Sequence, residues 1–313
     1  MSRRRERLRV LYVSDLGYEA KGRRYCDEDI LLSAELGEDF DVAICPPLAA
    51  QHLMDAFDVV VVRNSGPVLH YLAEYEAFRE AARSRGTCVF TDVTGRADQT
   101  GKQYLLDLFR AGYPVIPTID DAADIAQLPD ALDYIAKPKL GADSIGLTVV
   151  HRDDLPGLHY DDLLVQPRID FQYEVSFYYV DHVPQYALNA PDPAKRWELQ
   201  QYQASDADWA FAQQFIEWNT IERGIQRVDA CRTRDGDLLL VELEDLNPYL
   251  SLDLLDEHTR TSFVTAVKDS VRASASSRRA ELLAGAPDRR AGRSSSNTAR
   301  FPPSEGARFG PSS

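Results

Sequence analysis

A short turn, Asp235-Gly236, constrains this chain more than any other feature of its sequence. It separates two stretches rich in apolar residues, 225–232 and 238–244. Asp-Gly between two such stretches is typical of a two-residue β-hairpin turn, and a turn of fixed length fixes which residues of the two strands face each other. The sequence therefore predicts an antiparallel strand pair in which Arg234 faces Asp237.

This register gathers acidic residues at the far end of the hairpin. Counting back from the turn places Asp229 opposite Glu242. On the same side of the sheet, Arg227 lies opposite Glu244. Directly opposed Cβ atoms lie about 5 Å apart, and like charges at that separation destabilise a sheet. Because Mg²⁺ prefers carboxylate oxygens in proteins, the pattern predicts a divalent metal site.

An acidic face left in water is the alternative interpretation. Strict alternation places Leu238 and Leu240 on the same face as the two glutamates, so this face is expected to be apolar near the turn and acidic only at its far end. A solvated strand face is polar along its length. The metal site is therefore favoured.

The first third of the chain alternates short apolar runs with amphipathic stretches, which is typical of parallel strands joined by crossover helices. The predicted strands are 10–13, 42–44, 59–62 and 89–90, with a helix between 71 and 82. Ligand-binding loops lie at the carboxyl ends of such strands. The basic residues near these loops are candidates to bind a substrate carboxylate: Lys21, Arg23, Arg24 and Arg63.

The chain becomes rich in predicted strands after one more helix. Thr100 and Gln103 have the spacing of a capping box for a helix that ends at Gly112. Strands are predicted at 134–136, 147–150, 163–165, 174–180 and 186–188. A helix from about residue 206 is expected to close at Gly224. Residues 271–313 are rich in Ser, Arg, Gly, Ala and Pro, which predicts a disordered tail.

The charge balance limits the possible partners. A formal net charge of −15 opposes binding to nucleic acid or anionic lipid, which require a basic surface. The apolar run 8–13 is too short for a signal peptide or a membrane span. The four cysteines form no CxxC pair. We therefore expect a cytoplasmic protein with reduced thiols that binds neither nucleic acid nor membranes.

Competing motifs lack essential parts. The stretch 95–103 comes near a phosphate-binding P-loop but has five residues between its glycines where four are required. No GxGxxG follows the first predicted strand, and neither GxSxG nor HExxH is present. These observations argue against dehydrogenases, α/β-hydrolases and zinc proteases.

Several segments together resemble the ATP-grasp superfamily, from about residue 89 to residue 255. Lys102, before the stretch GYPVIPT at 112–118, is similar to the family's first phosphate-binding lysine before its GxPxPxT strand. Lys137, before the stretch GADSIG at 141–146 that contains Ser144, resembles the lysine and glycine loop that cover the phosphates. A lysine and the N–H groups of such a loop both suit phosphate oxygens.

The same resemblance implies contacts to the nucleoside. Gln166, Arg168 and Ile169 are similar to the segment between subdomains that holds the adenine. Glu174 occupies the place of the ribose-binding carboxylate. Arg196 lies in a connection where related ligases bring a further cation to the γ-phosphate.

The resemblance also implies metal ligands. Asp229, Glu242 and Glu244 match the metal-binding acids of the family. The family usually shows Glu-x-Asn at the last pair, whereas this chain has Asn247 three residues after Glu244, so either side chain could be the second ligand. Arg227 is suited to steady the charge of a phosphorylated intermediate.

A fold and an activity follow from the resemblance. It implies an α/β and α+β protein with a Rossmann-like N-terminal substrate domain (1–110), followed by a small (111–168) and a large (169–270) ATP-grasp subdomain. ATP and one or two Mg²⁺ ions, which Mn²⁺ can replace, would activate the carboxylate of a small, amino-acid-like molecule as an acyl phosphate. An amine would then attack it. Relatives make dipeptides and antibiotic precursors, so the new bond could join two molecules or close a ring.

Three other classes of protein stay open. A phosphotransferase with the same grip on ATP would release a stable phosphorylated product. A non-catalytic nucleotide-binding protein would hold ATP without turnover. A binding module for another protein would use the basic residues of the tail.

Overall fold

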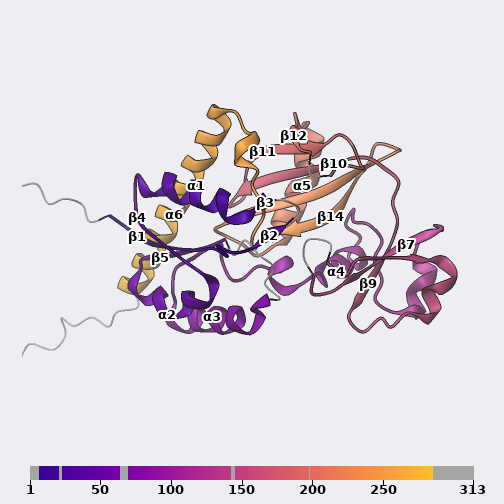
Figure 1. The fold of residues 1–313 in the computed structure, drawn as a ribbon, viewed down its shortest axis with the longest axis horizontal. Helices are drawn as coiled ribbons and strands as arrows, with labels where there is room; N and C mark the ends of the chain where they lie inside the picture. The colour runs from indigo at the N-terminus through magenta and orange to yellow at the C-terminus, as the bar shows by residue number, and fades with distance from the viewer. Residues whose placement is uncertain (1–6, 21–22, 64–69, 142–144, 197, 285–313) are drawn as a thin grey trace, which may run out of the picture.

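The part of the chain that the structure describes contains three main β-sheets and a two-stranded ribbon, together with helices. The computed structural model describes residues 7–20, 23–63, 70–141, 145–196 and 198–284. Figure 1 shows the N-terminal sheet at the left, the smallest of the three at the lower right, and the largest above and between them. Among the described helices, none has both the length and the apolar character to cross a bilayer.

The N-terminal unit is a parallel sheet with helices on both faces. Its elements are β1 (Arg9–Val13), β2 (Glu19–Ala20), β3 (Arg23–Arg24), α1 (Tyr25–Gly37), β4 (Asp41–Cys45), η1 (Pro47–Ala49), α2 (Ala50–Leu53), η2 (Met54–Ala56), β5 (Val59–Val62), α3 (Leu72–Arg85) and β6 (Val89–Phe90). The strand order is β4-β1-β5-β6, parallel throughout, as the apolar runs predicted. Val10 and Tyr12 join the core on the α1 side, whereas Leu11 and Val13 join the core on the α2 and α3 side.

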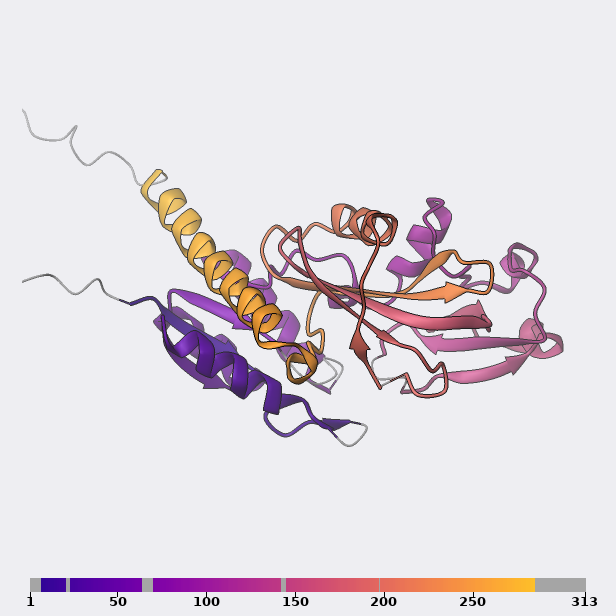
Figure 2. The same ribbon diagram turned by 90° about the horizontal axis from the view of Figure 1, so that it is seen from above.

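Helix α6 (Glu257–Ala284) completes the core of this unit from the other end of the chain. Figure 2 shows it lying across the N-terminal layer. Phe263, Val267 and Val271 are buried against the inner face of the sheet. The predicted disordered tail is therefore wrong for residues 271–284, because Val271 continues the apolar stripe of the helix. Residues 285–313 lie outside the described part of the chain.

The small unit is a three-stranded antiparallel sheet of order β8-β7-β9. This unit and the segment before it contain η4 (Asp98–Thr100), α4 (Tyr104–Arg110), η5 (Ala122–Gln127), β7 (Asp133–Pro138), β8 (Thr148–His151), η6 (Arg152–Gly157) and β9 (Leu163–Pro167). Tyr134 and Ala136 of β7 point into the core of the unit. Because side chains alternate along a strand, Ile135 and Lys137 point to the opposite face.

The large unit is a five-stranded antiparallel sheet of order β12-β11-β10-β13-β14. Its elements are β10 (Phe171–Val180), β11 (Val183–Ala190), β12 (Gln200–Gln201), α5 (Asp206–Trp218), β13 (Ile225–Thr233), β14 (Leu238–Glu244) and η7 (Leu252–Leu254). Phe177 and Val228 pack toward α5 on one face. The alternate residues, such as Ser176 and Asp229, lie on the other face, which is where the predicted site residues gather.

A short segment after α4 joins the two antiparallel sheets. Val115 forms a parallel bridge with Leu240 of β14, and Ile119 forms an antiparallel bridge with Val165 of β9. The backbone N–H of Ile119 donates to Val165 O at 3.0 Å. This segment therefore holds the small sheet against the edge of the large one.

The hairpin of β13 and β14 has the predicted register at its acidic end but not near its turn. Asp229 pairs with Glu242, as predicted, whereas Ala230 pairs with Leu240, so Val241 is an extra residue on one strand. Such a bulge shifts the alternation of the strand by one residue. Leu238 and Leu240 consequently face the α5 core, and the expectation that they share a face with the glutamates is wrong.

Two predicted helix boundaries are also wrong. Thr100 does not cap α4, because its hydroxyl donates to Ala97 O at 3.0 Å and ends a separate 3₁₀ turn. Helix α4 begins at Tyr104, so Lys102 precedes it. Helix α5 ends at Trp218 with Asn219 as its C-cap, and the predicted end at Gly224 lies six residues too far along the chain.

Candidate active site

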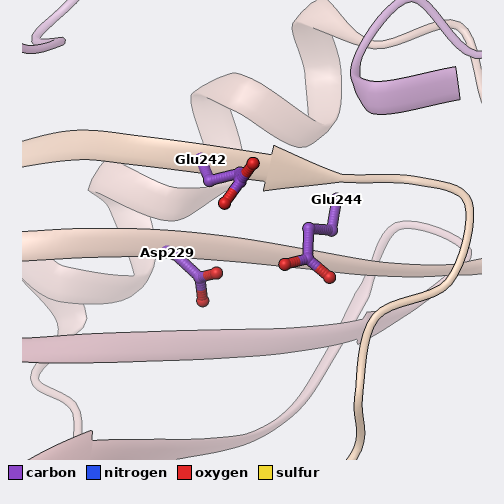
Figure 3. A group of neighbouring side chains, drawn as sticks. All are labelled: Asp229, Glu242 and Glu244. Carbon is purple, nitrogen blue, oxygen red and sulfur yellow. The ribbon is translucent and has the colours of Figure 1, made fainter. Parts of the chain in front are cut away.

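Three carboxylates come together on the face of the large sheet opposite α5. Asp229 projects from β13, and Glu242 and Glu244 project from the end of β14. One carboxylate oxygen of each lies within 4.8 Å of the others, and Figure 3 shows the three groups converging on one region. The predicted gathering of these acids is confirmed.

Arg227 lies inside this cluster. Its guanidinium donates to Asp229 Oδ2 at 2.8 Å, contacts Glu244 Oε1, and donates to the backbone oxygen of Tyr249 at 2.8 Å. Burial lowers the pKa of Arg227, but the charges of Asp229 and Glu244 outweigh that effect and raise it well above its ordinary value. The residue is therefore a fixed positive charge between two of the acids.

Glu242, the third acid of the cluster, is in contact with Lys102, which precedes α4. Lys102 Nζ contacts Glu242 Oε1, and both side chains are largely buried. The backbone N–H of Lys102 donates to Lys139 O at 2.7 Å, which ties the residue to the strand that carries the second predicted phosphate lysine. One lysine therefore connects the acid cluster to the small sheet.

Lys137 lies at the end of β7, on the face of the small sheet that points away from its core. Its side chain is half-buried. Loss of hydration lowers the pKa of Lys137 to about 7, and the positive charges of Lys102 and Arg196 contribute in the same direction. Three cationic side chains thus repel one another, so an anion bound among them would relieve that repulsion.

The predicted ribose carboxylate is engaged with a predicted phosphate cation. Arg196 Nε donates to Glu174 Oε2 at 2.6 Å. Glu174 lies on β10, two residues from Ser176, on the same face of the sheet as Asp229. This ion pair therefore borders the acid cluster, and a nucleotide could replace it only by reorienting Arg196, which is half-exposed.

The predicted adenine segment lies at the end of β9. Gln166 is buried and donates to Thr118 Oγ1 at 2.8 Å. Arg168 is exposed, and its backbone N–H donates to Asp133 O at 3.0 Å. Ile169 is half-buried in the connection to β10. Ser144, predicted in the phosphate-covering loop, lies outside the described residues.

Asn247 is half-buried three residues beyond β14, in a segment that packs against the N-terminal unit. Arg63, predicted as a candidate for a substrate carboxylate, is instead buried against this segment. It is only 3% exposed, and it pairs with Glu28 and Asp29. Arg24 pairs with Asp27 at the surface. The expectation that Arg63 binds substrate directly is therefore wrong.

One polar partner of the site was not predicted. Ser176 Oγ donates to Asp229 Oδ1 at 2.6 Å and orients that carboxylate. Ser176 pairs directly with Asp229 across β10 and β13. These strands are far apart in the sequence, so no short turn reveals their register, whereas the turn between β13 and β14 does.

The donor set fits a hard divalent cation. The three carboxylates and the two cations in contact with them, Lys102 and Arg227, have a formal net charge of −1. Carboxylate oxygens are the preferred ligands of Mg²⁺, which commonly keeps waters and phosphate oxygens in its remaining positions. The three acids are thus suited to hold Mg²⁺ together with a polyphosphate.

No protein-family model matches the sequence, and no curated protein matches it either. Solved structures do match. The structure of D-cycloserine synthetase DcsG is similar with a TM-score of 0.66 at 21% identity, covering 84% of this chain and 99% of that chain. D-alanine–D-alanine ligase from Bacillus anthracis, complexed with ATP, gives a TM-score of 0.62 at 12% identity, covering 88% and 99%. The ATP-grasp ligase PsnB, complexed with a precursor variant, Mg and ADP, gives 0.56 at 14%, covering 85% and 98%.

More than four fifths of this chain is covered in each case. The chain has the ATP-grasp fold, and the resemblance seen in the sequence is confirmed at that level. Among the three structures described, D-cycloserine synthetase DcsG has the highest TM-score and the highest identity.

Proposed function

We propose that this protein is an ATP-dependent ligase that activates a carboxylate as an acyl phosphate and forms an amide-type bond with an amine. The observation that carries the proposal is the cluster of Asp229, Glu242 and Glu244, in direct contact with Lys102 and Arg227. Such a pairing of acids and cations suits phosphoryl transfer, which depends mainly on positioning and on charge neutralisation.

Asp229, Glu242 and Glu244 would hold one or two Mg²⁺ ions, with Asn247 as an alternative to Glu244. The metal, when bound, supplies positive charge that neutralises the phosphate oxygens. Lys102 is in contact with Glu242 in the protein alone, and we infer that it turns from this carboxylate to a phosphate oxygen. Lys137 would hold the phosphates from the small sheet as a protonated ammonium group.

The proposed chemistry has two steps. A carboxylate oxygen of the substrate attacks the γ-phosphorus of ATP, the bond to the bridging oxygen breaks, and ADP leaves. The amine nitrogen then attacks the acyl carbon, the carbon–oxygen bond to phosphate breaks, and the nitrogen loses a proton. Arg227, fixed between Asp229 and Glu244, would steady the negative charge of the acyl phosphate, with Arg196 as a further cation.

The nucleoside would lie between the two antiparallel sheets. Gln166 lies at the end of β9, Arg168 and Ile169 lie in the connection to β10, and Glu174 lies near the start of β10. The face of the small sheet that carries Lys137 also carries Val149, which is 57% exposed and suits the apolar surface of a base. The covering of adenine by these residues is a proposal for nucleotide-bound crystals to test.

The substrate is proposed to be a small, amino-acid-like carboxylic acid. Tyrosine rings lie next to the carbonyl that Arg227 holds: Tyr25 and Tyr249 have centroids 5.1 Å apart, and Tyr18 lies 5.5 Å from Tyr25. Rings with apolar faces and polar edges suit such a molecule. Similarity to DcsG makes ring closure within one molecule, and a place in antibiotic biosynthesis, the first alternative to test.

The similar structures also leave a peptide substrate to be tested, since PsnB is solved with a precursor peptide. Phosphate release from ATP should be measured against a panel of amino acids, hydroxy acids and short peptides, with mass spectrometry of the product. A carboxylate labelled with ¹⁸O separates the mechanisms. A ligase transfers one labelled oxygen to inorganic phosphate, whereas a phosphotransferase leaves a stable phosphorylated product and releases no phosphate.

The metal assignment is tested with a matched pair of variants in one hairpin. Asp229→Asn should lower magnesium-dependent ATP turnover by more than about 100-fold, because loss of outer-shell partners alone costs about 10- to 100-fold. Asp235→Asn, in the exposed turn, should leave turnover unchanged. Wild-type turnover in Asp229→Asn, with the fold intact by circular dichroism, would refute the assignment.

A further inference from the structure

Two arginines, of which Arg63 is buried and Arg227 is largely buried, donate to adjacent carbonyl oxygens in the segment after β14. Arg63 Nη1 donates to Pro248 O at 2.7 Å, and Arg227 Nη1 donates to Tyr249 O at 2.8 Å. Arg63 follows β5 of the N-terminal sheet, whereas Arg227 belongs to β13 of the large sheet. The segment that contains Asn247 is therefore held between two units of the protein.

The N-terminal unit forms further hydrogen bonds with this segment through Glu28 of α1. Glu28 Oε1 accepts from the N–H of Leu250 at 2.7 Å and from Arg63 Nη2 at 3.1 Å. Glu28 Oε2 accepts from the N–H of Leu252 at 3.3 Å. Asp29 Oδ1 accepts from Arg63 Nε at 2.9 Å. The Glu28–Arg63 pair thus binds the backbone of residues 248, 250 and 252.

Stability alone does not account for this arrangement. Glu28, Asp29 and Arg63 are each no more than 6% exposed, and a buried ion pair often stabilises a fold no better than apolar residues of the same volume. Its hydrogen bonds do fix geometry. Ser251, inside the gripped segment, has a left-handed φ of 52°, a conformation that persists in a non-glycine residue only where its surroundings impose it.

We propose that Glu28 and Arg63 are positioning residues: they set the backbone of residues 247–252 and, through Tyr249 O, the place of Arg227 among the metal-binding acids. The inference rests on the proposed function. On this inference the N-terminal unit, in addition to any contact with substrate, fixes the geometry of the metal site through residues 247–252. The guanidinium of Arg227 reaches Tyr249 O, Asp229 and Glu244 at once, so a displaced carbonyl displaces that guanidinium.

Three substitutions test the proposal. Arg63→Met removes the hydrogen bonds of the guanidinium to Pro248 O, Glu28 and Asp29. Arg63→Lys keeps the charge but lacks the forked donor geometry, and Glu28→Gln keeps the shape of the side chain but removes its charge. Arg79→Met is the matched control, because Arg79 is also buried and also joins a glutamate to a backbone carbonyl, which in its case is Val93 O and not a carbonyl of residues 247–252.

The first readout is the metal requirement. The Mg²⁺ concentration for half-maximal ATP turnover should rise about 10- to 100-fold in Arg63→Met and Arg63→Lys, the range typical of lost outer-shell partners. Arg79→Met should keep the wild-type value. A purely structural role would lower the amount of folded protein without moving this concentration, so unchanged metal dependence in folded Arg63→Lys overturns the proposal.

The second readout needs no turnover. Amide hydrogen exchange of a peptide covering residues 247–252 should be faster in Arg63→Lys and Glu28→Gln than in the wild type and in Arg79→Met. Mn²⁺ binding, followed by electron paramagnetic resonance, should weaken in the same variants. If no compound of the substrate panel stimulates ATP turnover by the wild type, the proposed function fails while these two measurements still decide the positioning role. Wild-type exchange and Mn²⁺ affinity in both variants would refute it.

Discussion

Lys137 should take up a proton when MgATP binds. In the protein alone its pKa is about 7, because it is half-buried and lies near Lys102 and Arg196. Phosphate oxygens favour the charged form and should return the pKa toward the ordinary lysine value of 10.5. Between these two values the free protein lacks a proton that the complex holds, so binding consumes a proton from solution.

The size of the effect follows from the two pKa values. At about pH 8 only about a tenth of the free protein carries the proton, so binding should take up about 0.9 protons per site. At about pH 6 the uptake should fall to about 0.1. The affinity for the nucleotide should correspondingly fall by up to about tenfold for each pH unit above 7, since proton uptake becomes unfavourable as protons become scarce.

Calorimetric titration with a non-hydrolysable ATP analogue and Mg²⁺ measures this uptake directly. The observed enthalpy, plotted against the ionisation enthalpy of several buffers, has a slope equal to the number of protons exchanged. Lys137→Met measures the protons that are exchanged on binding by groups other than Lys137, such as the nucleotide and the metal-bound water. Lys139→Met is the matched control, because Lys139 lies two residues further along the chain, just beyond β7, and pairs with Asp120. Equal slopes for wild type and Lys137→Met at pH 8 would refute the argument.

Two further predictions concern the structure around the site. Gly95→Ala should lower the free energy of unfolding, measured in urea, by about 1–3 kcal/mol. The new Cβ would lie 2.1 Å from Asp245 Oδ2, an atom that accepts hydrogen bonds from Ala97 N at 3.1 Å and Asn219 Nδ2 at 3.0 Å. Gly37→Ala places no atom within 4 Å of its new Cβ and should not change the stability, so equal urea midpoints for the two variants would contradict this prediction. Truncation after Ser270 should lower the melting temperature, since it removes Val271, which is fully buried. Truncation after Ala284 should leave the melting temperature unchanged. An unchanged melting temperature after truncation at Ser270 would show that the end of α6 does not stabilise the core.

The predicted pairing of Asp229 with Glu242 is correct because two departures from the predicted hairpin cancel each other. The sequence suggested a two-residue turn, but Thr233 N donates to Asp237 O, so the loop is one residue longer and the register near the turn shifts by one. The bulge at Val241 then restores the predicted pairing of Asp229 with Glu242. The extra residue of this bulge is a valine, a residue that is also common in regular strands, so the sequence gives no signal for the bulge.

Local signals predicted the strands well, whereas contacts between distant segments could not be predicted. The buried strands β1 and β5 were predicted from their short apolar runs. The burial of Arg63 depends on a carbonyl 185 residues further along the chain, and the order of residues 271–284 depends on packing against the first sheet. Neither contact has a local pattern, since each is created only by the tertiary fold.

Helix α6 has a consequence for the way this protein is made. The ribosome releases the strands of the first sheet long before the helix that covers them, and until then one apolar face of that sheet has no partner from the end of the chain. Phe263 also packs edge-on against Tyr186, with centroids 5.4 Å apart, so the same helix joins the first sheet to the large one. A chain that is still being synthesised therefore cannot complete this packing, and a chaperone that shields this face during synthesis should raise the yield.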